Sequence, residues 1–356
     1  MKIAVAIPSR EISGGVALAQ WTFASSLRVR GHDVRCLVPT ARWMMLLHRF
    51  VPSKLRDFFV DMRAPAQAKV FGPQFVITAD WYSLWHKRHV GIPVFHGGYG
   101  MTLRYAPPPS WLGRLKTSLL WWLQRKAAAR APFFIAVSQE ALEMFGLPNG
   151  HVCLNATDLD RLRPVSGQEK ADAKIRQNLE GDVVLIAGRW SPEKRLESIW
   201  DLPQQMGRRL LVCIPDPAEA ERFADLCVGR DDILVRSYAK GIPDDIWSAT
   251  DCVYMPSRYE GCSMLWIEAA ARGIPVVGTK VGHLIDLAKQ HPELEDLLMP
   301  RDDLSCAAEK IETALAHGNA WCKAMRGYAE QHHSIHMLGA RLEAVLQKVK
   351  IPSQYK

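Results

Sequence analysis

Two acidic side chains flank the start of one predicted helix. Four residues just before this helix form the core of a predicted site, namely Glu260, Gly261, Cys262 and Ser263. Gly261 lets backbone approach a ligand closely, and Ser263 is a good N-cap for a helix over 264–272. The free N–H groups of that helix start favour a phosphate, and Glu268 could accept hydrogen bonds from a ribose diol. Alternatively, both acids only stabilise the helix N-terminus electrostatically.

A second segment supplies positive charge. Gly188, Arg189 and Lys194 follow the apolar run 183–187, and Pro192 between them suits the first turn of a helix. A nucleoside diphosphate leaving group carries about two negative charges, which fixed Arg and Lys side chains can stabilise as a metal ion would. A solvated basic turn is the alternative, and it accounts for the neighbouring Arg195 better than for Arg189 or Lys194.

His96 is the candidate among the histidines. It follows a strand pattern over 93–95 and precedes two glycines, so we expect it at the cleft edge of the first domain. A lone loop histidine is otherwise more often structural. Three histidines near the end of the chain lack partners at metal-ligand spacing, and we expect them at the surface: His332, His333 and His336. We therefore predict no metal site.

Residues 111–130 form an amphipathic stretch rich in Trp, Leu and basic residues. Leu112, Leu115, Leu119 and Leu123 recur at spacings of three and four. Membrane or acceptor contacts are predicted for Arg114, Lys116, Trp121, Trp122, Arg125 and Lys126. Such a mixture suits a membrane surface, and 42–63 is a second basic and apolar segment. The alternative is an ordinary buried helix whose leucines pack on the first sheet.

The elements that must hold these residues alternate between strand and helix patterns. The alternation begins with a strand over 2–7 and restarts with a strand at 183–187. This order predicts two doubly wound, Rossmann-like α/β domains with parallel sheets that face a cleft. We expect one domain over 1–163, a second over 164–334, and a C-terminal helix in 335–356 that crosses back to the first domain. The polar stretch 158–174 is the predicted linker.

Composition agrees with an ordinary globular chain and adds one asymmetry. The 356 residues carry a net charge of +8. Residues 1–163 hold 21 basic and 9 acidic side chains, whereas the remainder hold 24 and 28. A basic first half attracts anionic membranes, phosphorylated acceptors or nucleic acid. None of the eight cysteines forms a CxxC pair, and no apolar run reaches the roughly 20 residues that span a bilayer. We expect a cytoplasmic protein, neither exported nor transmembrane.

The motifs together resemble retaining glycosyltransferases of family 4, which have the GT-B architecture. The resemblance rests on the Gly188-Arg189 pair with Lys194 downstream, on Glu260 and Glu268 separated by seven residues, and on the Ala-x-Gly-x-Pro-Val-Val run at 271–277. Three amino-terminal features also match: the glycine-rich loop at Gly14 and Gly15, the run 31–34, and a degraded motif at 155–158.

The resemblance implies an acceptor-binding domain over 1–163 and a nucleotide-sugar-binding domain over 164–334, and it implies roles for these residues. Arg189 and Lys194 would hold the donor diphosphate, Glu268 the ribose, and Glu260 with the backbone at 261–263 the transferred sugar. His96 would lie near that sugar, and Gly14 and Gly15 would contribute to donor binding. It implies no cofactor and no metal, with a nucleotide-sugar, UDP-linked, as substrate. Two departures lie in the expected cleft: Trp190 replaces a smaller residue, and His283 replaces a second glycine after Gly282.

The predicted function is transfer of a hexose to a membrane-associated glycolipid or a cell-surface polysaccharide of the lipopolysaccharide type, by an enzyme held peripherally at the inner face of the membrane. An acceptor that is small and soluble, such as an antibiotic or a sugar phosphate, is the alternative. A sugar-nucleotide epimerase or a phosphorylase could share the architecture, but the spacing of Glu260 and Glu268 and the lack of a cofactor lysine motif disfavour both. A nucleic-acid-binding protein is disfavoured because no binding motif accompanies the charge.

Overall fold

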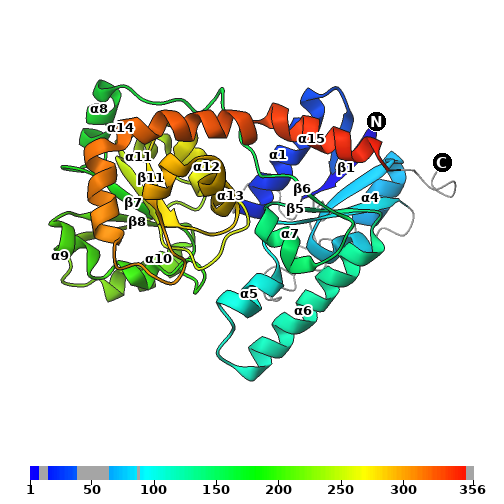
Figure 1. The fold of residues 1–356 in the computed structure, drawn as a ribbon, viewed down its shortest axis with the longest axis horizontal. Helices are drawn as coiled ribbons and strands as arrows, with labels where there is room; N and C mark the ends of the chain where they lie inside the picture. The colour runs from blue at the N-terminus through cyan, green and yellow to red at the C-terminus, as the bar shows by residue number, and fades with distance from the viewer. Residues whose placement is uncertain (8–14, 38–63, 86–88, 350–356) are drawn as a thin grey trace. The chain divides into compact units, whose positions relative to one another are not determined.

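The computed structural model describes residues 1–7, 15–37, 64–85 and 89–349 (Figure 1). They form two compact units. Unit 1 comprises Met1–Leu103, Pro107–Ala156 and Ile335–Lys356, and unit 2 comprises Arg104–Ala106 and Thr157–Ser334. Gly14 and the segment 42–63, both singled out above, lie outside the described residues.

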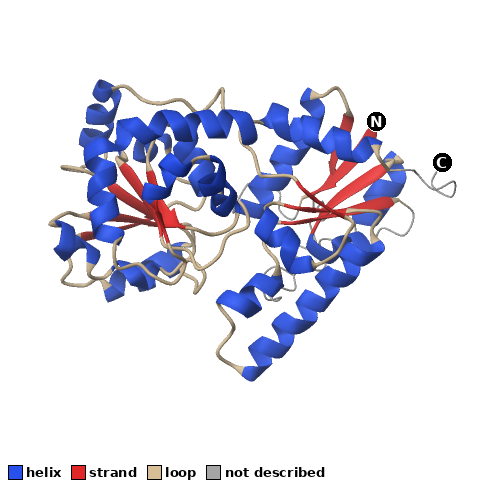
Figure 2. Ribbon diagram, viewed as in Figure 1, coloured by secondary structure: helices blue, strands red, loops and turns tan. Residues whose placement is uncertain are grey.

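Unit 1 is built on a parallel six-stranded sheet. Its strands are β1 (Lys2–Ala6), β2 (Asp33–Leu37), β3 (Phe75–Ala79), β4 (Val90–Phe95), β5 (Phe134–Ala136) and β6 (Gly150–Val152), in the order β2-β1-β3-β4-β5-β6. The helices of this part of the chain are α1 (Gly15–Val29), α4 (Ala64–Phe71), η1 (Asp80–Trp85), α5 (Tyr99–Tyr105), α6 (Trp111–Arg130), α7 (Gln139–Phe145) and α15 (Ile335–Gln347). Helices flank the sheet (Figure 2).

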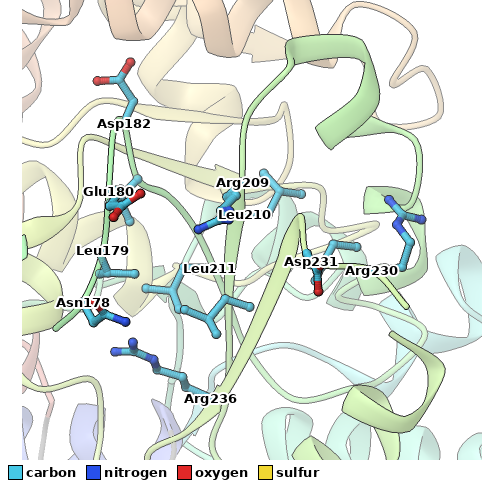
Figure 3. Close-up of a pocket in the computed structure, with 13 residues that line it drawn as sticks. Asn178, Leu179, Glu180, Asp182, Arg209, Leu210, Leu211, Arg230, Asp231 and Arg236 are labelled. Carbon is cyan, nitrogen blue, oxygen red and sulfur yellow. The ribbon is translucent and has the colours of Figure 1, made fainter. Parts of the chain in front are cut away.

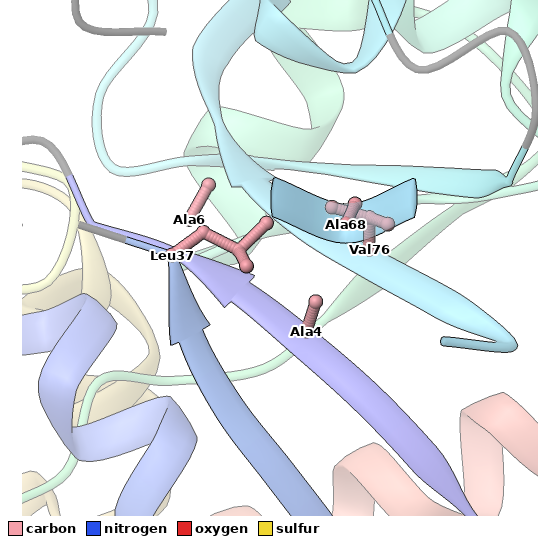
Figure 4. Close-up of a cluster of buried hydrophobic side chains, with 5 residues drawn as sticks. All are labelled: Ala4, Ala6, Leu37, Ala68 and Val76. Atoms are coloured by element: carbon pink, nitrogen blue, oxygen red, sulfur yellow. The ribbon is translucent and has the colours of Figure 1, made fainter. Parts of the chain in front are cut away.

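The inner strands of unit 1 are largely buried because helices cover the sheet, whereas the edge strands β2 and β6 are only partly buried. Every residue of β3 is buried, as a parallel strand requires when both faces of its sheet are covered. Figure 4 shows a small-residue cluster made of Ala4, Ala6, Leu37, Ala68 and Val76. Ala68 comes from α4, so the alanines of β1 let this helix approach the sheet closely.

The last helix packs on the first one. Gly339 of α15 lies so close to α1 that a Cβ atom there would stand 2.5 Å from the carbonyl oxygen of Ser26. Leu338 and Leu342 are buried beside it. Arg30 and Glu343 form an ion pair of 2.5 Å at the edge of this contact. The C-terminal helix therefore belongs to unit 1, although the chain reaches it through unit 2.

Unit 2 has its own parallel six-stranded sheet. Its strands are β7 (Val184–Ala187), β8 (Leu210–Ile214), β9 (Ile233–Ser237), β10 (Cys252–Met255), β11 (Val276–Thr279) and β12 (Leu298–Met299), in the order β12-β11-β10-β7-β8-β9. The helices are α8 (Gly167–Arg176), η2 (Leu196–Ile199), α9 (Leu202–Met206), α10 (Pro217–Leu226), α11 (Asp244–Ala249), α12 (Met264–Ala271), α13 (His283–Gln290), η3 (Pro292–Leu297) and α14 (Ala307–His332). The strand order reverses between β7 and β10, where doubly wound sheets bind ligands.

The structure corrects two expectations about unit 2. The stretch 158–174 is not all linker, because α8 begins inside it. Ser166 caps this helix by accepting a hydrogen bond from the Glu169 N–H group, and the Glu169 side chain accepts one from the Ser166 N–H group. This is a capping box, which the Ser-x-x-Glu spacing could have predicted. The edge strand β9 was also missed, because its pattern ends on Arg236 and Ser237.

In the part of the chain that the structure describes, no helix is both long enough and apolar enough to cross a membrane.

Candidate active site

The carboxyl ends of β7 and β10 bring the two predicted donor segments together. These strands are hydrogen-bonded neighbours, so the loops that follow them leave the sheet side by side. Lys194 from the first loop donates a 2.5 Å ion-paired hydrogen bond to Glu260 from the second. Ser257 donates a second hydrogen bond to the same carboxylate oxygen at 2.7 Å. The structure thus holds a lysine and a glutamate, 21% and 12% exposed, at the switch point of the sheet.

Arg189 is placed differently from Lys194. Its side chain is 68% exposed and pairs with Glu193 at 2.8 Å, four residues along the chain. The backbone of Glu193 in turn accepts a 2.7 Å hydrogen bond from the Arg258 N–H group, which ties the two loops together. Arg189 is therefore a mostly exposed cation in the same loop as Lys194, paired at the surface with Glu193.

The start of α12 provides a backbone site beside Glu260. Ser263 caps the helix, with its hydroxyl accepting from the Trp266 N–H group at 3.4 Å. The preceding loop is locked by Gly282, whose φ is +58° and whose added Cβ would lie 2.3 Å from the Gly261 carbonyl oxygen. The His283 N–H group donates to that same oxygen at 3.1 Å. Only glycine fits at 282, because both the backbone angle and the close approach exclude a side chain.

Glu268 lies one turn into α12 and is half-buried. Burial raises the pKa of its carboxyl group above the usual value, with Arg272 opposing the shift. Within the described residues, no group donates a hydrogen bond to this carboxylate. A half-buried carboxylate without donors favours an arriving ligand that brings its own hydroxyl groups.

Two neighbours of the cationic segment differ from expectation. Arg195, expected to be the solvated cation, is buried and donates to the Arg301 carbonyl oxygen at 2.9 Å. Its role is structural. Trp190, which the resemblance marked as a departure from a smaller residue, packs edge-on against Phe223 with ring centroids 5.4 Å apart.

The carboxyl edge of the unit 1 sheet carries the other candidates. His96 follows β4, and its Nε2 atom forms a 3.1 Å hydrogen bond with the side-chain amide of Gln20 in α1. Burial lowers the pKa of His96 to about 4, although a hydrogen bond with Asn155 opposes the shift. The imidazole is therefore neutral near pH 7. Gly15 is the exposed first residue of α1.

Sequence reasoning missed a second titratable group on this edge. Asp80 directly follows β3, has a φ of +51°, and accepts a 2.8 Å hydrogen bond from Gln124 of α6. Gln124 also accepts from the Tyr99 N–H group at 2.8 Å. Burial raises the pKa of Asp80 to about 6. An acid directly after a buried strand was the available signal.

Helix α6 exposes its apolar residues instead of burying them. Trp111, Leu112, Leu115, Leu119 and Trp122 are between 53% and 72% exposed. The buried face of the helix carries small and polar residues, namely Thr117, Gln124, Ala127 and Ala128. The alternative that the leucines pack on the sheet is therefore wrong for Leu112, Leu115 and Leu119.

Trp121 does not belong to the exposed face of α6. Its ring packs against Phe145 at a centroid distance of 4.8 Å and covers Gly98 and Gly100. Trp122 is the exposed tryptophan, with the Lys126 ammonium group 4.4 Å from its ring centre. Arg114, Lys116 and Arg125 are exposed as predicted contacts should be.

A separate hollow of about 420 Å³ lies in unit 2 (Figure 3). Its lining includes Asp182, Val183, Arg209, Leu210 and Ile233. These residues stand at the amino ends of β7, β8 and β9. Because ligands of such sheets bind at the carboxyl ends, this hollow is not the donor site.

Comparison with known families agrees with the geometry. Residues 13–161 match the model described as Glycosyltransferase Family 4, and residues 181–317 match the model described as Glycosyl transferases group 1. Together the two matches span most of the sequence. The chain belongs to glycosyltransferase family 4. It is a nucleotide-sugar-dependent glycosyltransferase with a GT-B-like fold of two parallel α/β sheets.

Solved structures of this glycosyltransferase fold cover nearly the whole chain. Sucrose-phosphate synthase from Thermosynechococcus elongatus is 18% identical, with 98% of each chain covered and a TM-score of 0.74. Anabaena HepE in complex with UDP-glucose is 16% identical, with 98% of this chain and 100% of HepE covered and a TM-score of 0.73. WaaG, a glycosyltransferase involved in lipopolysaccharide biosynthesis, is 13% identical, with coverages of 98% and 100% and a TM-score of 0.68. No curated protein sequence matches the chain.

One expectation about this glycosyltransferase's histidines is wrong. His333 is fully buried at the end of α14, whereas His336 is exposed. His333 lies in an aromatic cluster with Trp266, Tyr328 and His283. The short local sequence around 332–336 gave no sign of this, because Trp266 and His283 come from α12 and α13.

Proposed function

We propose that this glycosyltransferase moves a hexose from a UDP-linked donor to a membrane-associated glycolipid or polysaccharide of the lipopolysaccharide type, with retention of anomeric configuration. The donor part of the proposal is supported mainly by the pair of Lys194 and Glu260 at the switch point of the unit 2 sheet. HepE, with a similar fold, was solved with UDP-glucose.

The donor diphosphate would take the positions that anions favour. Lys194 and Arg189 would donate charge-assisted hydrogen bonds to it, and the start of α12 would add backbone N–H groups. Lys194 would then exchange part of its contact with Glu260 for the phosphate, while Glu268 would accept hydrogen bonds from the ribose hydroxyls.

The chemical step breaks one bond and forms another at the same face of the sugar. The bond from the anomeric carbon to the diphosphate oxygen breaks as the acceptor hydroxyl oxygen bonds to that carbon. The hydroxyl proton passes to the departing diphosphate. Glu260 would stabilise the positive charge that develops on the sugar ring, and Lys194 the negative charge that develops on the leaving group. His96, being neutral, would help to orient the sugar without contributing charge.

The membrane part of the proposal rests on α6. Along a helix of 100° per residue, Trp111, Leu112, Leu115, Leu119 and Trp122 fall on one face. The helix contains no acidic residue, and exposed basic side chains flank the apolar face. Apolar residues that insert among headgroups, with basic residues attracted to anionic lipid, are typical of peripheral membrane helices. The enzyme would thus sit at the inner face of the membrane.

Liposome co-sedimentation across a salt series tests this part. The wild type should bind anionic vesicles at low salt, and binding should weaken as salt screens the charges. Replacing Arg114, Lys116, Arg125 and Lys126 by Glu should abolish most of it. A second variant with Leu115 and Leu119 replaced by Ser should lose the part of binding that salt does not remove. If the wild type does not bind anionic vesicles at low salt, the membrane proposal is refuted and a small soluble acceptor becomes the better hypothesis.

Proton NMR of the product tests retention. An α-linked donor should give an α-linked product, whether the acceptor is a glycolipid or a soluble sugar. A β-linked product would refute the same-face mechanism and the roles given to Glu260 and His96.

A further inference from the structure

Three buried side chains with metal-ligating atoms converge beneath the loop that precedes α12. They are Cys262, His283 and His333, which are 5%, 0% and 0% exposed. One ligand atom from each lies within 4.8 Å of the others, and the Cys262 Sγ to His333 Nδ1 distance is 4.0 Å. All three belong to unit 2. They come from three separate segments: the donor loop, the start of α13 and the end of α14.

His283 is the member of this trio that packing alone does not explain. Both of its ring nitrogens are buried, and neither has a hydrogen-bond partner within the described residues. A buried polar group without a partner destabilises the fold, because it has lost its hydrogen bonds to water without gaining others. A ligand that accepts the lone pair of the ring would offset the cost.

We infer that Cys262, His283 and His333 bind a zinc ion that fastens the donor loop to the end of α14. One thiolate and two imidazoles are a ligand set that suits zinc, with bonds of about 2.0–2.3 Å. Such bonds place tetrahedral ligand atoms about 3.5 Å apart, so side-chain shifts of an ångström or less would close the site. Three protein ligands leave one coordination position, which a water molecule would fill.

The site would act on the donor loop through the backbone. Cys262 lies between Gly261 and Ser263, and the His283 N–H group already donates to the Gly261 carbonyl oxygen. His333 ends α14, and its carbonyl oxygen accepts from the Thr157 N–H group at 2.9 Å. Zinc would therefore brace the loop that carries Glu260 from beneath, without touching the donor. This role is separate from catalysis and does not depend on which acceptor the enzyme uses.

Metal loading of the full-length, tag-free protein tests the inference directly. After treatment with a chelator, the protein is titrated with Co²⁺ as a spectroscopic probe and then with Zn²⁺. We expect one Co²⁺ per chain, a thiolate-to-cobalt charge-transfer band, and displacement by one equivalent of Zn²⁺. Zinc should also raise the melting temperature, because a ligand that binds only the folded state stabilises it.

Two variants and one matched control locate the site. His283→Phe and His333→Phe keep a ring against Trp266 but remove a ligand, so zinc affinity should fall more than roughly 100-fold, beyond the loss typical of an outer-shell partner. His291→Phe alters another histidine ring on Tyr328 outside the trio and should bind zinc as the wild type does.

The inference fails if the wild type takes up no metal and its melting temperature does not change when zinc is added, because the three residues are then only a packing cluster. It also fails if cobalt binds without the thiolate band, or if both Phe variants bind zinc as tightly as the wild type. None of these readouts requires the enzyme to be active, so they are independent of the proposed function.

Discussion

The carboxyl edges of the two sheets are built from different chemistry. The unit 2 edge holds full charges, with Lys194 paired to Glu260 and Arg189 paired to Glu193. The unit 1 edge holds a histidine and an aspartate supported by side-chain amides. Burial shifts both of these groups toward their uncharged forms, because it lowers the pKa of His96 to about 4 and raises that of Asp80 to about 6.

The distribution of charge at the two sheet edges differs from the distribution of net charge between the two halves of the sequence. The first half of the sequence is basic and the second slightly acidic, yet the cations suited to a diphosphate lie in the second. The basic residues of unit 1 gather elsewhere, for example on α6. Net charge therefore describes the long-range partners of a protein, whereas the chemistry of a site is set by the few groups at the strand ends.

Among these changes, removing the Glu260 carboxylate from the unit 2 edge should have the largest effect, which is on turnover. Glu260→Gln should lower turnover roughly 100- to 1000-fold, the usual cost of losing one group that stabilises transition-state charge. Glu295→Gln is the matched control, since Glu295 is also paired with a lysine of unit 2, Lys280, but at the surface. Steady-state kinetics on both proteins, with melting temperatures as a check on folding, would decide. Equal rates in the two variants would exclude Glu260 from the reaction.

Replacing Glu268 should weaken donor binding, and this loss should be smaller than the loss of turnover caused by replacing Glu260. Glu268→Ala should weaken UDP binding by about 1.5–3 kcal/mol, the value of hydrogen bonds to a charged group. If the ribose is its partner, 2′-deoxy-UDP should bind the wild type more weakly than UDP does, and the variant should distinguish the two nucleotides less. Isothermal titration calorimetry measures all four affinities. A variant that still discriminates fully between the nucleotides would show that Glu268 does not hold the ribose.

His96, at the carboxyl edge of the unit 1 sheet, should make the unfolding free energy depend on pH. His96 has a lower pKa in the folded state than the usual 6.5, so the unfolded state binds its proton more readily. Its stabilising contribution is complete above about pH 6.5 and is lost as pH falls toward 4. Between pH 7 and 4, the wild type should therefore lose about 2–3 kcal/mol more unfolding free energy than His96→Asn. Urea denaturation measures the unfolding free energy of both proteins at each pH. If the wild type and His96→Asn lose the same amount between pH 7 and 4, the imidazole of His96 is not held in its neutral form by burial.

The smallest expected effect is that of divalent metals on turnover. Arg189, Lys194 and the α12 helix start supply the positive potential that the leaving group needs, so magnesium or manganese should change the rate little. Kinetics with and without added metal after brief chelation would check this. Complete loss of turnover that magnesium restores would contradict it. A drop in melting temperature that only zinc reverses would instead report the separate site at Cys262.

Much of the fold was predictable because parallel strands read as short apolar runs between helices. The donor segments were predictable for the same reason: they follow buried strands, and parallel strands end at one edge. What failed were features set by tertiary contact. Leu115 is exposed, whereas Trp121 on the same helix is half-buried, because of where α6 meets its neighbours, which periodicity does not predict.

Residues brought together from distant segments were also beyond sequence reasoning. His333 gives no local sign that it will be buried against Trp266, and its neighbour His336 in the same short stretch is exposed. Asp80 was within reach, because its position after β3 is visible in the sequence, but its φ and its contact with Gln124 are not. The spacing of residues along the chain identifies candidate residues within one loop. It does not identify a site whose residues come from three distant segments.

Binding of UDP to the wild type and two single variants tests the central claim, that the charged edge of unit 2 holds the donor diphosphate. Lys194→Met removes the cation at the carboxyl ends of the strands, and Arg209→Met removes one from the hollow at their amino ends. Titration calorimetry should show affinity reduced roughly 10- to 100-fold in Lys194→Met, corresponding to about 1.5–3 kcal/mol, and unchanged in Arg209→Met. Unchanged affinity in Lys194→Met together with a loss in Arg209→Met would contradict the account.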